Sequence, residues 1–310
     1  MSGPHSLEGR VALVTGGARG IGRAIAAELV ASGASVVIAD PGVSIGGDQP
    51  DRSAVHQAAA ALGPRALAWP EDISVPGAAE TAVKLAVDRF GALDLVVNNA
   101  AMLRDGFIFK LERANWERVI QTNLTGAYAV LAAATPVIRE AAKAGRAPGR
   151  IVNMISTAGL YGNYGQAAYA AAKAGLVGLT RVVAMDMARS KVNCNAVAPF
   201  AATRVTDSIQ PANEAQASYK ARALKIPPEY VARLVAWLCS SACEVTGQVF
   251  GVRGREVFLF SQSRPAARIV TAPLAELTPE ALDSAIAIEM QDQFVDLATD
   301  LEAFNTEPLL

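Results

Sequence analysis

Short apolar runs rich in β-branched residues alternate along the chain with longer segments in which apolar residues recur every three or four positions. The short runs predict strands, and the longer segments predict helices between them. The strands are expected at 11–14, 35–39, 66–69, 93–97, 150–155, 192–197 and 247–252. Because strand-helix-strand crossovers are right-handed and pair strands in parallel, the pattern predicts an α/β fold with a single doubly wound parallel sheet and helices on both faces.

The pattern also predicts where this domain ends. A tight turn at 253–255 should join the last strand to EVFLF, and beyond Pro265 the composition shifts. Thr278 followed by Pro279 predicts a helix that extends through MQDQF. We expect a catalytic domain over 1–264 and a C-terminal extension over 265–310, which is too short for its own core and should pack on the domain or on a neighbouring subunit.

Two connections are longer than an ordinary turn. Residues 41–51 are rich in glycine, proline and aspartate and predict a surface loop. The stretch 200–226 is polar and irregular, and loops of that length commonly act as lids or binding loops.

Composition narrows the class of protein. Of 310 residues, 52% are hydrophobic and 18% charged, which describes a well-buried globular chain. The 28 basic and 29 acidic residues nearly cancel, so nothing favours nucleic acid or an anionic membrane as a partner. The N-terminus lacks the features of a signal peptide and no uninterrupted apolar stretch reaches spanning length, which predicts a cytoplasmic protein. The three cysteines form no zinc pattern, and we expect no metal.

A glycine-rich turn, TGGARGIG at 15–22, lies between the first strand and an apolar-periodic helix. Strand, glycine turn and helix is the context that a dinucleotide-binding fingerprint requires. Gly16 permits the tight turn, Gly20 lets the backbone approach a pyrophosphate, and Gly22 lets the helix pack closely on the strand. The positive end of the helix dipole would then face the phosphates.

The second predicted strand ends in Asp40, eighteen positions beyond Gly22. A carboxylate there can accept hydrogen bonds from both hydroxyls of an adenosine ribose, and its charge repels a 2′-phosphate, which favours NAD over NADP. Arg19 would favour NADP instead, because it could pair with that phosphate. We give Asp40 more weight because it lies where the phosphate itself would be.

Other polar residues follow the predicted strands or interrupt a helix. Asp72 could reach adenine or be a plain turn residue, and Asn98 and Asn99 could bind a ligand or only satisfy loop backbone. Asn123 lies within the amphipathic segment 115–143, where an asparagine is unfavourable unless its amide has a task. It could distort the helix and hold a water.

Tyr169 and Lys173 are four positions apart in an Ala-rich helix, so both project from the same face. A phenol titrates near pH ~10, and a neighbouring cation stabilises the phenolate, which makes the pair suited to proton transfer. Ser156 ends the preceding strand and could hydrogen-bond a substrate oxygen. Taken alone, a Tyr and a Lys at this spacing also occur on many helix surfaces without function.

These motifs jointly resemble the short-chain dehydrogenase/reductase (SDR) family, with its Rossmann-type fold, over roughly 9–252. The matching elements appear in order: the glycine spacing at 15–22, Asp40, Asn-Asn-Ala at 98–100, Asn123, Ser156, Tyr-x-x-x-Lys at 169 and 173, and Pro199. Two departures are Ala101 and Phe200, where the family usually has glycine. The stretches NNAAMLRDGFIF, GLYGNYGQAAYAAAKAG and NAVAPFAATRVT look most like the dehydrogenase domain of peroxisomal multifunctional β-oxidation enzymes and bacterial hydroxysteroid dehydrogenase relatives.

The resemblance implies roles for matching positions. Tyr169 would be the acid/base, Ser156 would orient the substrate oxygen, Lys173 would bind the nicotinamide ribose and lower the Tyr pKa, and Asn123 would hold a water in the proton relay. The implied cofactor is NAD, with candidate contacts from Gly16, Arg19, Gly20, Ile21, Gly22, Asp40, Asp72, Ile73, Asn99, Ala100, Tyr169, Lys173, Pro199 and Thr203. Candidate substrate contacts are Ser156, Tyr161 and Phe200, with further lining expected from 102–109, 160–164 and 200–226.

The sequence therefore predicts an NAD-dependent oxidoreductase that interconverts a secondary alcohol and a ketone. The resemblance implies a hydrophobic substrate such as a 3-hydroxyacyl-CoA or a hydroxysteroid, and a homodimer or homotetramer formed through the helices of Asn123 and Tyr169. Two other classes were weighed. A sugar-nucleotide epimerase normally spaces its glycines GxxGxxG, unlike Gly16, Gly20 and Gly22, and a non-catalytic NAD-sensing protein would lose the Tyr, Lys, Ser and Asn set.

Overall fold

The computed structural model describes residues 3–211, 213–271, 273 and 277–310 and divides into two compact units. The first contains Met1–Phe260 and Thr299–Leu310, and the second contains Ser261–Ala298. The last twelve residues of the expected extension thus belong to the first unit, because aromatic and charged side chains there pack on it.

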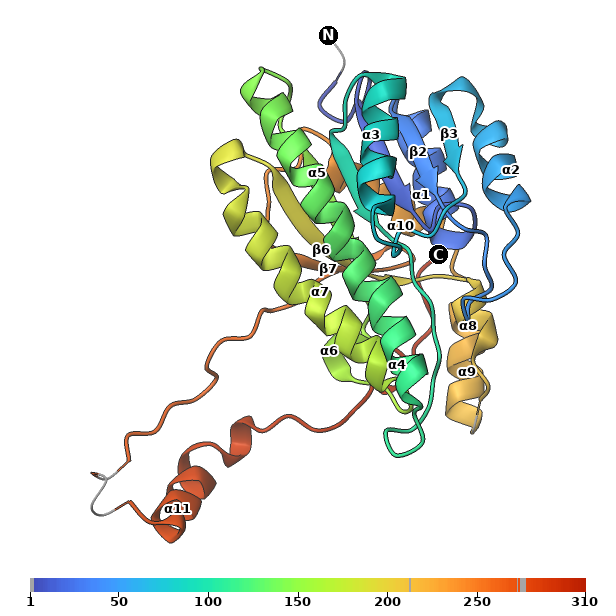
Figure 1. Cartoon of the computed structure of the whole chain (residues 1–310). Coiled ribbons are helices and arrows are strands. Elements are labelled where there is room, and N and C mark those ends of the chain that lie inside the picture. Colours follow the sequence, from blue (N-terminus) through green and yellow to red (C-terminus); the bar gives the residue numbers. More distant parts are fainter. Residues whose placement is uncertain (1–2, 212, 272, 274–276) are drawn as a thin grey trace. The chain divides into compact units, whose positions relative to one another are not determined.

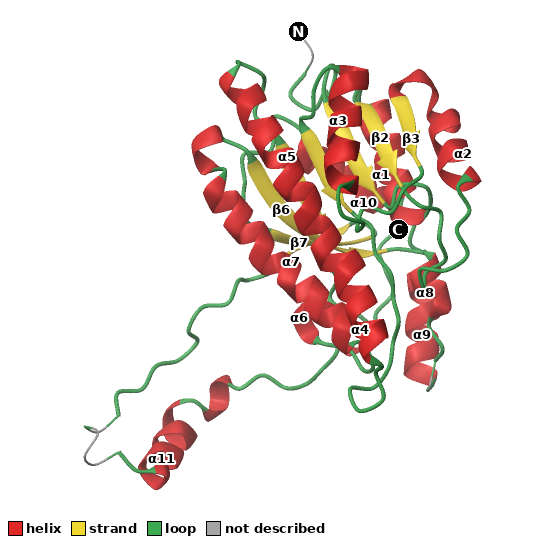
Figure 2. Cartoon of the chain, viewed as in Figure 1, coloured by secondary structure: helices red, strands yellow, loops and turns green. Residues whose placement is uncertain are grey.

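The first unit is built on one eight-stranded sheet of order β3-β2-β1-β4-β5-β6-β7-β8 (Figure 2). All neighbouring pairs are parallel except β7 with β8, which form the expected hairpin around Gly254 at φ 57°. The strands are β1 (Val11–Thr15), β2 (Ser35–Ala39), β3 (Ala66–Trp69), β4 (Leu95–Asn98), β5 (Arg150–Met154), β6 (Asn193–Phe200), β7 (Val249–Arg253) and β8 (Glu256–Leu259). The doubly wound parallel sheet is confirmed, with an antiparallel edge strand added.

Helices cover both faces of this sheet. Successive residues of β1 point to opposite sides, so Ala12 and Val14 join one apolar cluster while Val11 and Leu13 join the other. The first cluster contains side chains of α1 (Gly20–Ala31), α2 (Ser53–Leu62) and α10 (Glu229–Cys239). The second contains side chains of α3 (Ala78–Phe90), α5 (Gly126–Lys143) and α7 (Ala167–Asp186), which lie together across the sheet in Figure 1.

The segment around Asn123 is not one continuous α-helix. After α4 (Arg113–Ile120), a π-helical turn spans Gln121–Thr125 before α5 begins. The Asn123 amide nitrogen donates to the carbonyls of Val119 and Met102, both at 2.9 Å. The expected distortion is therefore real, because the amide competes for a carbonyl of its own helix.

The 200–226 stretch is more regular than its composition indicates. It contains α8 (Arg204–Ser208) and α9 (Glu214–Ala223), whose N-cap side chains, Thr203 and Asn213, accept backbone N–H groups of Thr206 and Gln216. Caps rather than an apolar stripe define these helices. The sequence pattern missed them because α9 has almost no apolar periodicity.

The remaining helices are short or lie near the C-terminus. They are α6 (Ala158–Tyr161), α11 (Pro279–Glu289) and α12 (Asp300–Ala303), with 3₁₀ turns at Gly63–Arg65, Ala188–Ser190 and Gln291–Gln293. Within the second unit, Thr278 caps α11 through the N–H of Ala281, as expected. The helix ends at Glu289, before MQDQF, so its predicted extent was too long.

By length and mean hydropathy, α7 would be able to cross a membrane. Lys173, Arg181 and Asp186 interrupt its apolar surface, and its inner face packs against β6. Such a helix is typical of a protein core as well.

Candidate active site

The carboxyl ends of six parallel strands open into one cavity of about 660 Å³. A crevice at this edge of a doubly wound sheet is where such folds bind ligands. Every cofactor-binding residue expected from the sequence lines it. β2 and β5 are separated in the sheet by β1 and β4, so the cavity has an Asp40 end after β2 and a Tyr169 end after β5.

The glycine turn after β1 is held by the strand beside it. Gly16 has φ 64°, and an added Cβ would lie 2.8 Å from the Ala100 Cα. Asn99 donates through its side chain to the carbonyls of Thr15 and Gly16, each at 3.0 Å. Asn99 therefore fixes the turn, whereas Asn98 is buried and donates to Asn153.

Gly20 and Gly22 have different reasons to lack a side chain. Gly20 has φ 53°, and its Cβ position faces the cavity, 3.7 Å from the Thr203 side chain. A ligand can therefore approach the backbone there. A Cβ at Gly22 would collide with the carbonyl oxygen of Gly16. Gly22 thus lets α1 pack on the turn after β1. The sequence had predicted a contact between this helix and the strand itself.

Asp40 is buried and oriented by the backbone. Its two carboxylate oxygens accept N–H groups of Ala18 at 2.9 Å and Gly42 at 2.8 Å. Each oxygen keeps a second lone pair, so the carboxylate can still accept hydroxyl groups. These features fit a ribose diol beside a glycine turn.

The Arg19 guanidinium is engaged by the 41–51 loop. It donates to the carbonyls of Gly42 and Val43 and pairs with Asp51 at 3.1 Å. Arg204, which the sequence did not single out within the 200–226 stretch expected to line the pocket, also lines this end and donates to the Val43 carbonyl. Its position on a short capped helix gave no periodic signal. Burial and the charge of Arg19 lower the pKa of Arg204.

The Asp72 carboxylate is also bound by neighbouring residues of the protein. One oxygen accepts from the backbone and hydroxyl of Ser74, and the other pairs with Arg118 at 3.2 Å. Asp72 and Ile73 line the cavity, yet the carboxylate's main contacts are those of a capped turn.

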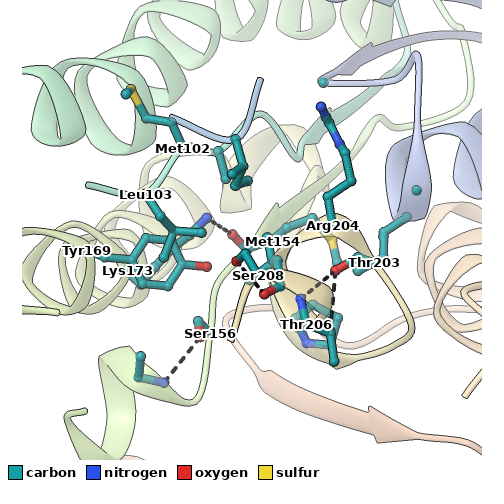
Figure 3. A pocket seen from close by; sticks show the side chains of 18 of the residues that line it. Met102, Leu103, Met154, Ser156, Tyr169, Lys173, Thr203, Arg204, Thr206 and Ser208 are labelled. Carbon is teal, nitrogen blue, oxygen red and sulfur yellow. Dashed lines mark hydrogen bonds between the residues drawn. The ribbon is translucent and has the colours of Figure 1, made fainter. Parts of the chain in front are cut away.

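Tyr169, Lys173 and Ser156 meet at the other end of the cavity (Figure 3). The Lys173 ammonium is buried, donates to the Met154 carbonyl at 2.7 Å and lies 5.6 Å from the Tyr169 ring centre. Ser156 accepts from the Ala158 N–H at 3.2 Å and also hydrogen-bonds Tyr169. α7 and the loop after β5 thus bring the three groups together.

Burial dominates the proton chemistry of this group. It raises the pKa of Tyr169 to about 12, although the Ser156 hydrogen bond works against the shift, and the charges of Asp105 and Asp300 raise it further. Burial lowers the pKa of Lys173 to about 7. The expectation of a lowered Tyr169 pKa thus does not describe these contacts, because desolvation disfavours both charged forms.

Asn123 lies behind the cavity wall, next to Thr122, which lines it. Its amide oxygen is buried and has no hydrogen-bond partner among the residues that the structure describes. A buried unpaired acceptor is costly unless a small ligand or water satisfies it.

The two aromatic residues expected to contact substrate differ in whether they line the cavity. Phe200 lines the cavity, and its ring packs on Phe304 with centres 4.8 Å apart. Tyr161 does not line the cavity, because its ring packs edge-on against Phe260 and Phe304. Phe107 and Phe109 stack on each other and are exposed.

Residues from the C-terminus complete this end. Asp300 and Leu301 line the cavity, although they lie over a hundred positions from Tyr169 in sequence. Sequence reasoning missed both residues, since no periodic signal connects a four-residue helix to a distant pocket. Only the capping box at Thr299 and Glu302 could have marked the helix itself.

The comparisons with known proteins show the family of the chain. The short chain dehydrogenase family model matches residues 10–217. A short-chain type dehydrogenase/reductase of Mycobacterium tuberculosis is 38% identical over 284 residues, covering 88% of this chain and 95% of the relative. A 3-oxoacyl-[acyl-carrier-protein] reductase of Synechocystis is 36% identical, covering 80% of this chain and 97% of that protein.

Mouse peroxisomal multifunctional enzyme type 2 is 35% identical over 91% of this chain, which spans only 37% of that enzyme. The crystal structure of a short chain dehydrogenase from Mycobacterium avium superposes with a TM-score of 0.74 at 35% identity, covering 91% and 96% of the two chains. The fold is of the Rossmann type, and the family match defines an oxidoreductase. The chain belongs to the short-chain dehydrogenase/reductase family, whose members typically use a nicotinamide cofactor.

Proposed function

We propose that this protein is an NAD-dependent dehydrogenase that interconverts a secondary alcohol and a ketone. The observation that carries the proposal is the convergence of Ser156, Tyr169 and Lys173 at one end of a cavity whose other end holds the glycine turn and Asp40. A nicotinamide cofactor would supply the hydride acceptor or donor, and the chain's own residues would bind, orient and move the proton.

Three side chains would carry the proton chemistry. Tyr169 takes the alcohol proton during oxidation, and Ser156 holds the reacting oxygen beside it. Burial keeps the phenol protonated, and the Lys173 ammonium, 5.6 Å from the ring centre, would favour the phenolate when it forms. The unpartnered Asn123 oxygen behind the wall is suited to hold a water that relays the proton.

Asp40 supports NAD as the cofactor. Its buried, backbone-oriented carboxylate would accept ribose hydroxyls and repel a 2′-phosphate, while Arg19 is occupied by Asp51 and two carbonyls. Arg19 and Arg204 are the residues that would favour NADP instead. A direct comparison of NAD and NADP at equal concentrations separates the two, and faster oxidation with NADP would reject the NAD assignment.

The substrate class is supported by the lining and by two relatives. Met102, Leu103, Met154, Ile155 and Phe200 give the cavity apolar walls. One relative is named as a 3-oxoacyl reductase and another as a peroxisomal multifunctional enzyme. We therefore propose a hydrophobic substrate such as a 3-hydroxyacyl thioester or a hydroxysteroid.

Screening NAD reduction with purified protein tests this function. The panel contains 3-hydroxyacyl-CoAs, hydroxysteroids and simple aryl or alkyl secondary alcohols. We expect NADH formation with a bulky apolar member of the panel and the reverse reaction with its ketone. Absence of turnover with every alcohol in both directions would contradict the proposal.

We also propose that the chain forms a homodimer or homotetramer through α5 and α7. Tyr128, Val182 and Met185 on these helices are exposed, with 58%, 52% and 72% of their surface accessible. Apolar side chains gathered on two neighbouring helices are typical of an interface. Light scattering at micromolar concentration should give a multiple of 32.2 kDa, and a monomer would refute the assembly.

A further inference from the structure

Asp300 is a buried carboxylate that the proton chemistry leaves unused. Only 7% of its surface is exposed, and it lines the cavity beside the loop after β5. One oxygen accepts the Thr157 hydroxyl at 2.5 Å, and the other is buried with no hydrogen-bond partner among the described residues. Thr157 directly follows Ser156, so this carboxylate lies next to the group that orients the substrate oxygen.

The segment that carries Asp300 is firmly attached. Phe304 packs its ring against Phe200, Phe258 and Tyr161. Arg222 of α9 donates to the side chain and carbonyl of Asn305, and pairs with Glu307 at 3.1 Å. The position of the carboxylate is therefore set by packing on β6, β8 and α6 and by hydrogen bonds from α9.

The charge of Asp300 is not neutralised by the protein. No described cation forms an ion pair with it, and burial raises its pKa, while hydrogen bonds from Thr157 and from the backbone N–H groups of Asp300 and Leu301 work against the shift. A second carboxylate, Asp105, is exposed and, among the described residues, accepts a side-chain hydrogen bond only from Gln166. Arg19 and Arg118 line the cavity, yet each is paired with its own aspartate. Arg204 and Lys173 also line it and donate to the carbonyls of Val43 and Met154.

We infer that Asp300 is a specificity-determining residue: its buried carboxylate lies in the wall of the Tyr169 end, so the site selects uncharged alcohols and rejects free hydroxy acids. This inference rests on the proposed function and narrows its substrate class. An anionic substrate would either face an unneutralised carboxylate in a poorly solvated site or force it to take up a proton, and both weaken binding. A carboxyl group masked as an ester or thioester carries no charge and therefore avoids the penalty.

The test uses three pairs of alcohols, each a carboxylate and its neutral ester. They are 3-hydroxybutyrate and its N-acetylcysteamine thioester, a 3-hydroxy bile acid and its methyl ester, and 4-(1-hydroxyethyl)benzoate and its methyl ester. NAD reduction is measured with the wild type, Asp300→Asn and Asp88→Asn. Asp88→Asn is the matched control, because it removes the same charge from an exposed pair with Lys84 on α3.

The expected result concerns the carboxylate members. The wild type should favour the neutral member of each pair that it oxidises, by at least about 10-fold in kcat/KM. Asp300→Asn keeps the shape and should raise kcat/KM for the anion by roughly 10-fold, chiefly through KM, as expected for one removed charge repulsion. The neutral member should change by less than about threefold and the KM for NAD should not change. Asp88→Asn should behave as the wild type.

Three outcomes would overturn the inference. In the first, the wild type has a higher kcat/KM for the anions than for the neutral members. In the second, Asp300→Asn has the same neutral-to-anion ratio of kcat/KM as the wild type; in the third, it loses kcat/KM equally for both members, which marks a merely structural residue. If the wild type oxidises none of the six alcohols and no other member of the panel, the proposed function is rejected, and this inference is rejected because it rests on that function. Turnover with an unchanged ratio rejects the role of Asp300 alone.

Discussion

The two ends of the cavity are built by different means. At the Asp40 end, glycines and an aspartate that lie within 25 positions of one another are fixed by backbone hydrogen bonds, and the charges of Arg19 and Arg118 are paired. At the Tyr169 end, the wall joins α7, the loop after β5, α9 and the C-terminal segment, and Asp300 is left unpaired. The Asp40 end is specified by residues close in sequence, and the Tyr169 end by tertiary packing. A substitution at one end should therefore leave ligand binding at the other end unchanged.

The largest expected effect on stability is a pH dependence at the Tyr169 end. The pKa of Lys173 is about 7 in the folded protein against an ordinary value of 10.5, so the unfolded chain binds the extra proton. The penalty is therefore full below pH 7 and disappears as the pH rises toward 10.5. Lys173→Met should gain roughly 2 kcal/mol more stability over the wild type at pH 6 than at pH 9.

Chemical denaturation at the two pH values measures this gain. Lys84→Met, which changes an exposed lysine of α3, is the control and should show no such difference. A gain for Lys173→Met that is equal at both pH values would show that the buried lysine stays protonated throughout.

Gly22→Ala should damage the Asp40 end next most strongly. The new Cβ would overlap the Gly16 carbonyl, so the turn must shift, and overpacking of this kind costs about 1–3 kcal/mol. The dissociation constant for NADH, measured by fluorescence titration, should rise about 10- to 100-fold. Gly178→Ala is a matched control, because nothing lies within 4 Å of its Cβ position. Unaltered NADH binding by Gly22→Ala would contradict the assigned turn.

Asp40→Asn should change cofactor choice without changing the chemistry. Loss of the charge weakens hydrogen bonds to the ribose and removes the repulsion of a 2′-phosphate. The NAD to NADP ratio of kcat/KM should fall about 10-fold. The neighbouring Asp51→Asn would be the wrong control, since it frees Arg19, and Asp88→Asn is used instead. A ratio that stays constant would assign selectivity to Arg19 and Arg204.

Phe304→Ala should give the smallest effect, and only at the Tyr169 end. Removing the ring loosens the aromatic group around Phe200 and the attachment of Asp300. The substrate KM should rise several-fold while NADH binding is unchanged. Phe294→Ala, an exposed residue of the second unit, is the control. An equal loss of NADH affinity would show that the two ends are not independent.

This difference explains what the sequence could predict. The turn at Gly16, Asp40 and the Tyr169 and Lys173 pair are short-range patterns, and the doubly wound parallel sheet followed from the alternation of predicted strands and helices. Arg204, Asp300 and the exclusion of Tyr161 depend on contacts between distant segments, which no local period encodes. The α8 and α9 helices were missed for a related reason, because polar caps rather than an apolar face define them.

Comparing Tyr169→Phe with the wild type tests the central claim most directly. The substitution keeps the ring and removes only the hydroxyl that would move the proton, so we expect kcat to fall by about 10²- to 10⁴-fold while NADH binds as before. Wild-type turnover by a Tyr169→Phe protein that still binds NADH would contradict the account.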